Sequence, residues 1–152
     1  MAKPAILLSV PVKKAAELSG LSAHMLTYLS RIEVLIPSGN EPGRGRRRLY
    51  TFSDVLFLRV IAELLIRGIE VKRLGKALKR AKDEADTWLD VRSRPHHFLV
   101  TDGTEVMLKK KGQLESITAG GQLVFAFVLD IAAAHKPLAQ AWPTQNAKLL
   151  HR

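Results

Sequence analysis

The chain has 152 residues, 47% of them apolar and 25% charged, enough for one ordinary domain or two small ones around a packed core. Its formal net charge of +10 predicts a polyanionic partner, chiefly nucleic acid, although an anionic membrane surface would attract the same charge. The lack of cysteine excludes disulfides and thiolate metal sites, and no stretch approaches the roughly 20 apolar residues of a membrane span. We therefore expect a soluble, cytoplasmic protein without a membrane partner.

The first predicted elements are two short helices joined by a tight turn. Residues 12–20, VKKAAELSG, predict a helix that stops at Gly20. Ser22 is placed to cap a second helix, AHMLTYLSRI. The apolar stripes of the two helices consist of Val12, Ala15, Ala16 and Leu18, and of Met25, Leu26, Leu29 and Ile32. Because only Leu21 separates the stop from the cap, the helices must cross steeply, which is typical of a helix-turn-helix.

A basic hairpin is predicted next. Residues 34–37 and 47–50, VLIP and RRLY, read as two short strands joined by a loop rich in glycine. The loop and second strand carry Arg44, Arg46, Arg47 and Arg48. Arginine holds a phosphate with two parallel hydrogen bonds, so these side chains are predicted to clamp DNA phosphates beside the groove that the second helix enters. The alternative is a solvated basic loop without a partner.

Two further helices follow the hairpin. Thr51 and Asp54 form a predicted capping box at the start of a helix that ends at Gly68. A last helix of this half begins near Glu70 and carries apolar residues at heptad spacing, namely Val71, Leu74, Leu78, Ala81, Ala85 and Trp88. This spacing predicts a short coiled-coil seam that takes up a partner surface. From Arg44 to Lys82, twelve residues are Lys or Arg and three are Asp or Glu.

The sequence changes character near residues 88–95, which divides it into predicted domains of residues 1–87 and 88–152. Residues 96–118 predict three short strands with turns at Asp102-Gly103 and Lys111-Gly112. The apolar run from Leu123 to Ile131 favours a buried strand over a buried helix, and a final short helix is expected to break near Pro137. The prediction is an α+β fold, with an N-terminal helix-turn-helix and a small β-rich C-terminal domain.

The first half resembles the DNA-binding domain of MerR-type transcription regulators over about residues 8–82. The resemblance rests on AAELSGLS (residues 15–22), on LIP after the second helix, and on Arg48, Tyr50 and Asp54 in an R-x-Y-x-x-x-D pattern. It implies a winged helix-turn-helix. The arginine and second tyrosine that usually touch DNA in this family are absent, and Arg46 and Arg47 replace a glycine and a tyrosine of its hairpin. The operator and the promoter-untwisting mechanism of the family are therefore not carried over.

Candidate DNA-binding residues follow from these elements. Base reading is assigned to the exposed face of the second helix, which carries His24, Thr27, Tyr28 and Arg31. Tyr28 matches a family contact position; its alternative role is a half-buried core aromatic. Ser22 with Lys13 and Lys14, near helix starts, could add phosphate contacts. Together with the four arginines, Tyr50 of the family pattern completes the set.

No catalytic or cofactor pattern stands out, and a metal site is not expected. Adjacent residues His96 and His97 point to opposite faces of an extended segment, and no third ligand is near in sequence. The second half is expected to form a homodimer, or to bind a toxin protein as the antitoxin of a two-gene module does; a small-molecule domain is a third use. The alternative of another class is an RNA-binding protein, which the scarcity of aromatic residues disfavours.

Overall fold

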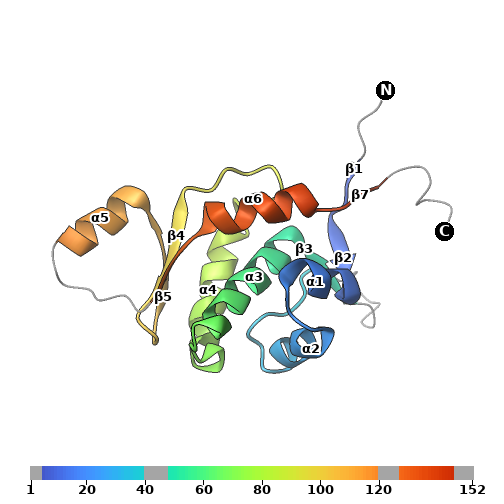
Figure 1. Ribbon diagram of the computed structural model, residues 1–152, viewed down its shortest axis with the longest axis horizontal. Coiled ribbons are helices and arrows are strands. Elements are labelled where there is room, and N and C mark those ends of the chain that lie inside the picture. Colours follow the sequence, from blue (N-terminus) through green and yellow to red (C-terminus); the bar gives the residue numbers. More distant parts are fainter. Residues whose placement is uncertain (1–4, 40–47, 120–126, 146–152) are drawn as a thin grey trace.

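The computed structural model describes residues 5–39, 48–119 and 127–145 (Figure 1). Its N-terminal half contains helices α1 and α2, the long helix α3, a short 3-10 helix η1 and helix α4. Their bounds are Val12–Ser19, Ala23–Arg31, Phe52–Ile66, Val71–Leu74 and Gly75–Ala85. The α+β class and the predicted order of helices in this half are thus confirmed. No helix among the described residues is long and apolar enough to span a membrane.

The short sheet beside the helix-turn-helix differs from the predicted hairpin. Residues 34–37 do not form a strand in the structure. Strand β3 (Leu49–Thr51) pairs instead with β2 (Ser9–Pro11) in antiparallel register, with Val10 opposite Tyr50. Val34, Leu35 and Pro37 are buried without strand pairing, so their apolar character serves the core. The prediction of a strand at 34–37 was wrong because a short apolar run indicates that residues are buried but does not determine their backbone conformation.

The heptad-spaced stripe of α4 is buried within its own chain. Val71, Leu74, Leu78, Ala81 and Ala85 belong to one core with α3, and each is at most 4% exposed. Trp88 packs against the same core, and its ring stacks on His97 with centroids 4.2 Å apart. The stripe therefore has its partner already, and its prediction as a seam for a second protein was wrong. A stripe of this spacing marks a buried helix face whichever surface covers it.

The second half is built on a three-stranded antiparallel sheet with the order β5-β4-β6. The strands are β4 (His97–Thr101), β5 (Val106–Lys110) and β6 (Phe127–Asp130). The turn at Asp102-Gly103 is present, with Gly103 at φ 96°. Asp102 accepts hydrogen bonds from the backbone of Glu105 and Thr104 and from the Thr104 hydroxyl, which lowers its pKa to about 2.

The third predicted strand of this segment is a helix. Residues Lys111–Ala119 form α5, because the Gln113 side chain reaches back to accept from the Lys110 backbone N–H at 2.9 Å and starts the helix there. Of the apolar run 123–131, residues 123–126 lie outside the described residues, and the strand expectation is confirmed over Phe127–Asp130. The Asp130 carboxylate then caps α6 (Ile131–Ala141) by accepting from the Ala132 N–H at 3.0 Å.

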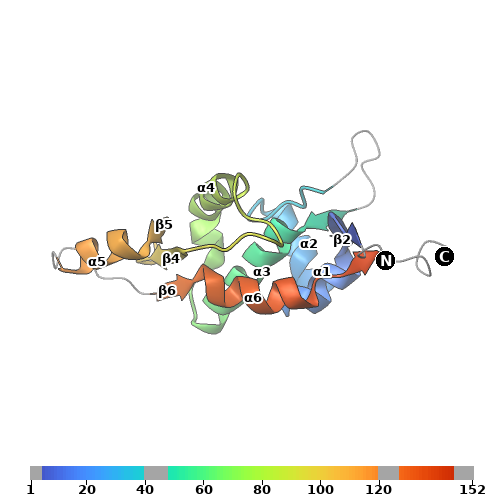
Figure 2. The same cartoon turned by 90° about the horizontal axis from the view of Figure 1, so that it is seen from above.

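Helix α6 continues through Pro137, so the predicted break there was wrong. Proline leaves the carbonyl of Ala133 without its helical donor. Both Ala133 and Pro137 are exposed, so water can satisfy that carbonyl while the opposite face, with Leu138, stays packed. Figures 1 and 2 show α6 lying along α3, the central helix of the first half.

The two halves share one hydrophobic core. Beyond α6, strand β7 (Thr144–Gln145) pairs antiparallel with β1 (Ala5–Ile6), at the opposite end of the chain. Phe52 of α3 makes edge contacts with the rings of His135 and Trp142, at 5.0 and 5.2 Å between centroids. The Trp142 indole N–H donates to the Leu7 carbonyl at 2.8 Å. The last described residues therefore close over the N-terminal half.

Candidate nucleic-acid interface

The turn between α1 and α2 has the geometry that the sequence predicts. Gly20 takes φ 82°, and its N–H donates to the Ala16 carbonyl at 3.0 Å. The Ser22 hydroxyl then accepts from the Met25 N–H at 3.0 Å and caps α2. Helix α3 holds this turn from behind, because Arg59 donates to the Leu18 carbonyl at 3.0 Å. These bonds end α1, start α2 and join α1 to α3.

One face of α2 is presented to solvent. Leu26 and Leu29 are buried beneath it, while the exposed side chains are His24, Thr27, Tyr28 and Arg31. The Tyr28 side chain is 36% exposed, and the Arg31 guanidinium carbon lies 5.9 Å from its ring centroid. This cation–π distance lets the ring hold Arg31 over the same surface. The structure thus brings all four predicted base-reading residues onto one accessible face.

A hydrogen bond joins this face to the basic segment. Arg48 donates from Nη1 to the Thr27 hydroxyl at 2.9 Å, and that hydroxyl is also 3.1 Å from the Ala23 carbonyl, to which it donates. Arg48 is half-buried at the start of β3. The Thr27 hydroxyl therefore has its proton and one lone pair engaged inside the protein. Arg48 also lies close enough to the Tyr50 hydroxyl to affect its pKa.

The two ends of the basic segment lie side by side. The Gly39 N–H donates to the Leu49 carbonyl at 2.8 Å. A Cβ at position 39 would lie only 2.8 Å from the Ser9 Cβ and 2.9 Å from the Leu49 oxygen, so this close approach requires glycine. Arg44, Arg46 and Arg47 lie outside the described residues. Their flanking residues tie the segment to the edge of α2.

A buried carboxylate anchors this region. Asp54 is fully buried, and it accepts from the Ser38 N–H at 2.8 Å, from the Thr51 N–H at 2.9 Å and from the Lys82 ammonium at 2.7 Å. Burial by itself lowers the pKa of Lys82, but the charges of Asp54 and Asp86 outweigh it and raise that pKa above 10.5. Asp54 thus connects the loop after α2, the start of α3 and helix α4.

Three other predicted residues have different surroundings. Tyr50 is fully buried on β3; burial raises its pKa, which the nearby Arg48 opposes. Its side chain packs in the core and offers no surface to DNA, so we leave it out of the interface. Lys13 is exposed. Lys14 makes a surface ion pair with Glu17 at 3.4 Å, which solvent screens.

A second basic surface was missing from the predicted site. The exposed side chains of η1 and α4 include Lys72, Arg73, Lys76, Lys79 and Arg80. None of them forms an ion pair within the part of the chain that the structure describes. Their i, i+3 and i+4 spacing could have revealed one exposed basic face.

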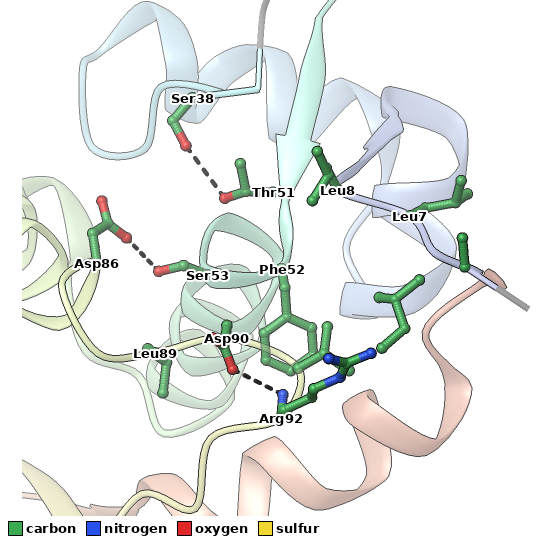
Figure 3. Close-up of a pocket in the computed structure, with 13 residues that line it drawn as sticks. Leu7, Leu8, Ser38, Thr51, Phe52, Ser53, Asp86, Leu89, Asp90 and Arg92 are labelled. Atoms are coloured by element: carbon green, nitrogen blue, oxygen red, sulfur yellow. Dashed lines mark hydrogen bonds between the residues drawn. The ribbon is translucent and has the colours of Figure 1, made fainter. Parts of the chain in front are cut away.

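A cavity of about 660 Å³ lies behind this interface (Figure 3). It is bounded by the N-terminal segment with Leu7 and Leu8, by the start of α3 and by residues 86–92. Ser38 and Thr51 meet across its wall with their hydroxyls 3.3 Å apart, and the Ser53 hydroxyl donates to Asp86. The same Ser38 and Thr51 bind Asp54, so the cavity wall and the interface share a hydrogen-bond network.

Comparison with known proteins identifies the first half. Residues 10–81 match the family described as MerR HTH family regulatory protein. The N-terminal half of the chain is a MerR-type helix-turn-helix domain. The match spans α1 through most of α4, and its boundaries agree with the resemblance over residues 8–82.

The chain is also similar to curated bacterial proteins. It is 27% identical over 117 residues to an uncharacterized HTH-type transcriptional regulator of Mycobacterium bovis, and equally so to proteins of the same description in two Mycobacterium tuberculosis strains. The alignment covers 76% of this chain and 50% of each relative. The chain thus spans about half the length of the curated relatives it matches. The aligned length exceeds residues 10–81, so the similarity extends beyond the MerR-type domain.

Proposed function

We propose that the protein is a sequence-specific, double-stranded-DNA-binding regulator of transcription. Helix α2 enters the major groove, and the basic segment around Arg44–Arg48 lies on the flanking phosphates. The observation that carries this proposal is the 2.9 Å bond from Arg48 to Thr27, which joins the exposed face of α2 to the segment. A single duplex can then meet both at once. The names of the relatives, transcriptional regulators, point in the same direction.

Within this interface the residues divide by role. His24, Tyr28 and Arg31 read bases, because their side chains are exposed on α2 and carry donors or acceptors for base edges. Thr27 holds Arg48 in place, since its hydroxyl is already engaged. Arg48 and its neighbours contact phosphates, with Ser22, Lys13 and Lys14 at the margin. The basic face of η1 and α4 widens the positive surface that attracts DNA.

The phosphate role predicts a specific salt dependence. Replacing Arg46, Arg47 and Arg48 together with Ala should weaken binding to all DNA sequences and lower the slope of log affinity against log salt by about 0.9 per lost contact. The matched control replaces Lys109, Lys110 and Lys111, which removes the same charge from β5 and α5. Fluorescence anisotropy with a labelled duplex measures both slopes. An unchanged slope in the arginine variant, or a preference for single-stranded RNA in competition, would overturn the proposal.

The reading role predicts a change of sequence preference. Arg31→Ala should alter the preferred base at one or two operator positions, with a loss of about 1–3 kcal/mol per broken base contact. Selection of binding sites from a random duplex pool, done with the wild type and the variant, gives the comparison. The same selected motif for both proteins would show that α2 does not read the operator.

The proposal includes a homodimer, because one small domain contacts too few base pairs and two copies would read two half-sites. The stripe of α4 is buried within the chain, so the dimer contact must come from another surface. Light scattering on the full chain tests this part alone. A monomer in solution, even with operator DNA, would instead favour a different protein partner, such as the toxin of a two-gene module.

A further inference from the structure

A second basic groove lies between α6 and the loop after α4. Its volume is about 420 Å³, and it is lined by residues 91–95 and by the side of α6 that carries Ala132, His135, Lys136, Ala139 and Gln140. In Figure 1, α6 runs along the top of the molecule and α2 lies at the bottom. A duplex bound to α2 therefore approaches from the side away from α6.

The charge of this groove is uncompensated. Its lining includes Arg92, Arg94 and Lys136 and no carboxylate. None of these three cations forms an ion pair among the described residues. Asp90, just before the lining residues in sequence, is engaged with the backbone, where its Oδ1 accepts from the Arg92 N–H at 2.9 Å. Arg92 also borders the first cavity (Figure 3), so Arg94 and Lys136 are the cations particular to this groove.

Hydrogen bonds join the floor of the groove to α6. His135 is 6% exposed, and its Nε2 lies 2.6 Å from the Asp90 carbonyl. Because a carbonyl only accepts, Nε2 carries the proton of that bond. The Ser93 hydroxyl also donates to the Asp90 carbonyl at 2.8 Å and lies 3.2 Å from the same Nε2. These bonds join residues 90 and 93 to His135 of α6 and so place the loop that carries Arg92 and Arg94 beside this helix.

The remaining wall is apolar and small. Val91, Pro95, Ala132 and Ala139 line it without a large side chain to fill the space. Sites of about 300–1,000 Å³ with an apolar wall and a few placed polar groups suit small organic molecules. We propose that this groove binds a small organic anion, with its phosphate or carboxylate between Arg94 and Lys136 and its apolar body against the wall. This inference does not depend on the proposed function.

The test uses the full chain and phenyl phosphate as the probe. In a titration followed by amide chemical shifts, residues 91–95 and 132–140 should respond, and 3-phenylpropionate in a second arm separates carboxylate from phosphate recognition. Arg94→Gln with Lys136→Gln should weaken binding by about tenfold or more for each lost charge-assisted bond. The control, Lys110→Gln with Lys111→Gln, removes the same charge elsewhere and should change affinity less than about twofold, the effect of screened surface charge.

Several results would contradict the binding of an anion in this groove. If no amide of the groove changes its chemical shift, the anion does not bind there. If both double variants weaken binding equally, only the overall charge attracts the anion. If inorganic phosphate binds with the same affinity as phenyl phosphate, the apolar wall does not contribute to binding. The salt slope of DNA binding should be unchanged in Arg94→Gln with Lys136→Gln. A lower slope would make the groove part of the DNA surface and overturn the proposal, whereas the loss of DNA binding in the arginine-segment variant leaves it untouched.

Discussion

Asp54 shows how one residue serves both a local and a distant contact. Its sequence position gives the capping box with Thr51, which the structure contains in full. The same carboxylate also binds Lys82, from a helix that begins 21 residues later in the chain, and Ser38 from the loop after α2. A buried charge is tolerated only when its oxygens are paired. Asp54 is therefore the residue through which α4 can affect the position of α2.

Replacing Lys82 with Met tests this anchor. The change leaves the buried Asp54 carboxylate without its cation and should destabilise the fold by about 3–5 kcal/mol. Lys14→Met, which breaks the exposed pair with Glu17, should cost less than about 1 kcal/mol. Urea unfolding at pH 7 compares the two, a pH at which Lys82 is charged because its pKa is raised. Equal losses in both variants would mean that Asp54 finds another partner.

His97 provides a pH-dependent contribution. Burial, followed by the charge of Lys110, lowers the pKa of His97 below 6.5, and its Nδ1 is buried without a hydrogen-bond partner among the described residues. The unfolded chain therefore binds a proton at this position more readily than the folded one. The stability that results is complete above pH 6.5 and is lost as pH falls through the lowered pKa.

We accordingly expect His97→Phe, which keeps the stacking on Trp88 and cannot be protonated, to lose less stability than the wild type between pH 7.5 and pH 5. The difference between their free energies of unfolding in urea, measured at the two pH values, isolates this residue because the other histidines are common to both. If the free energy of unfolding of the wild type instead rises relative to that of the variant as pH falls, the pKa of His97 is not lowered in the folded protein.

Among the elements, the base of the basic segment depends on a contact that local patterns do not contain. The strand predicted at residues 47–50 overlaps β3 (Leu49–Thr51) only at Leu49 and Tyr50, and its partner is β2, about 40 residues earlier, and not the residues just before the loop. Gly39 fits between Ser9 and Leu49 only because it has no side chain. The orientation of the arginine segment against α2 is thus set at this crossing.

Gly39→Ala should force this crossing apart, because the new Cβ would meet backbone that cannot move aside. We expect a loss of about 1–3 kcal/mol in the free energy of unfolding, as for overpacked cores, and weaker DNA binding. Gly112→Ala is the matched control, since no atom lies within 4 Å of its added Cβ and its helical site gains up to about 1 kcal/mol. Denaturant unfolding and anisotropy give both quantities. If Gly39→Ala changes neither the free energy of unfolding nor the affinity for DNA, β2 and β3 separate easily.

At the scale of the whole molecule, the chain closes on itself. The change in the pattern of apolar residues near residues 88–95 predicts separate domains at residues 1–87 and 88–152. In the structure, Leu138 of α6 and Trp142, which directly follows this helix, belong to the same core as Leu56 and Leu64 of α3. Strand β7 meets β1, and the Trp142 indole meets the Leu7 carbonyl. Continuous burial of this kind favours a single cooperative unit.

We therefore expect Trp142→Ala to destabilise the full chain by about 3–5 kcal/mol, as removal of a buried aromatic side chain does. Trp142→Phe retains an aromatic ring beside Phe52 but loses the indole hydrogen bond and part of the buried ring, so it should cost less than the alanine variant. Thermal unfolding followed by far-UV circular dichroism and by the fluorescence of Trp88 should give coincident transitions. Two separated transitions would support independent domains at residue 87.

The features that residue type and spacing establish are local. The stop at Gly20, the cap at Ser22, the capping box of α3 and the Asp102-Gly103 turn each depend on contacts within four residues, which spacing and residue type reveal directly. The exposed face of α2 follows from the same helical period. The family of the first half was also accessible, because its motif lies within these local elements.

Which surfaces meet depends on the packing of the complete fold. An apolar stripe or strand indicates that something covers it, and it carries no information about what does. For that reason the partner of β3, the burial of the α4 stripe against α3 and the return of α6 to the N-terminus were not predictable from spacing. The contact of Leu7 with Trp142 joins residues 135 positions apart. The groove of Arg94 and Lys136 likewise exists because the chain brings α6 back beside the loop after α4.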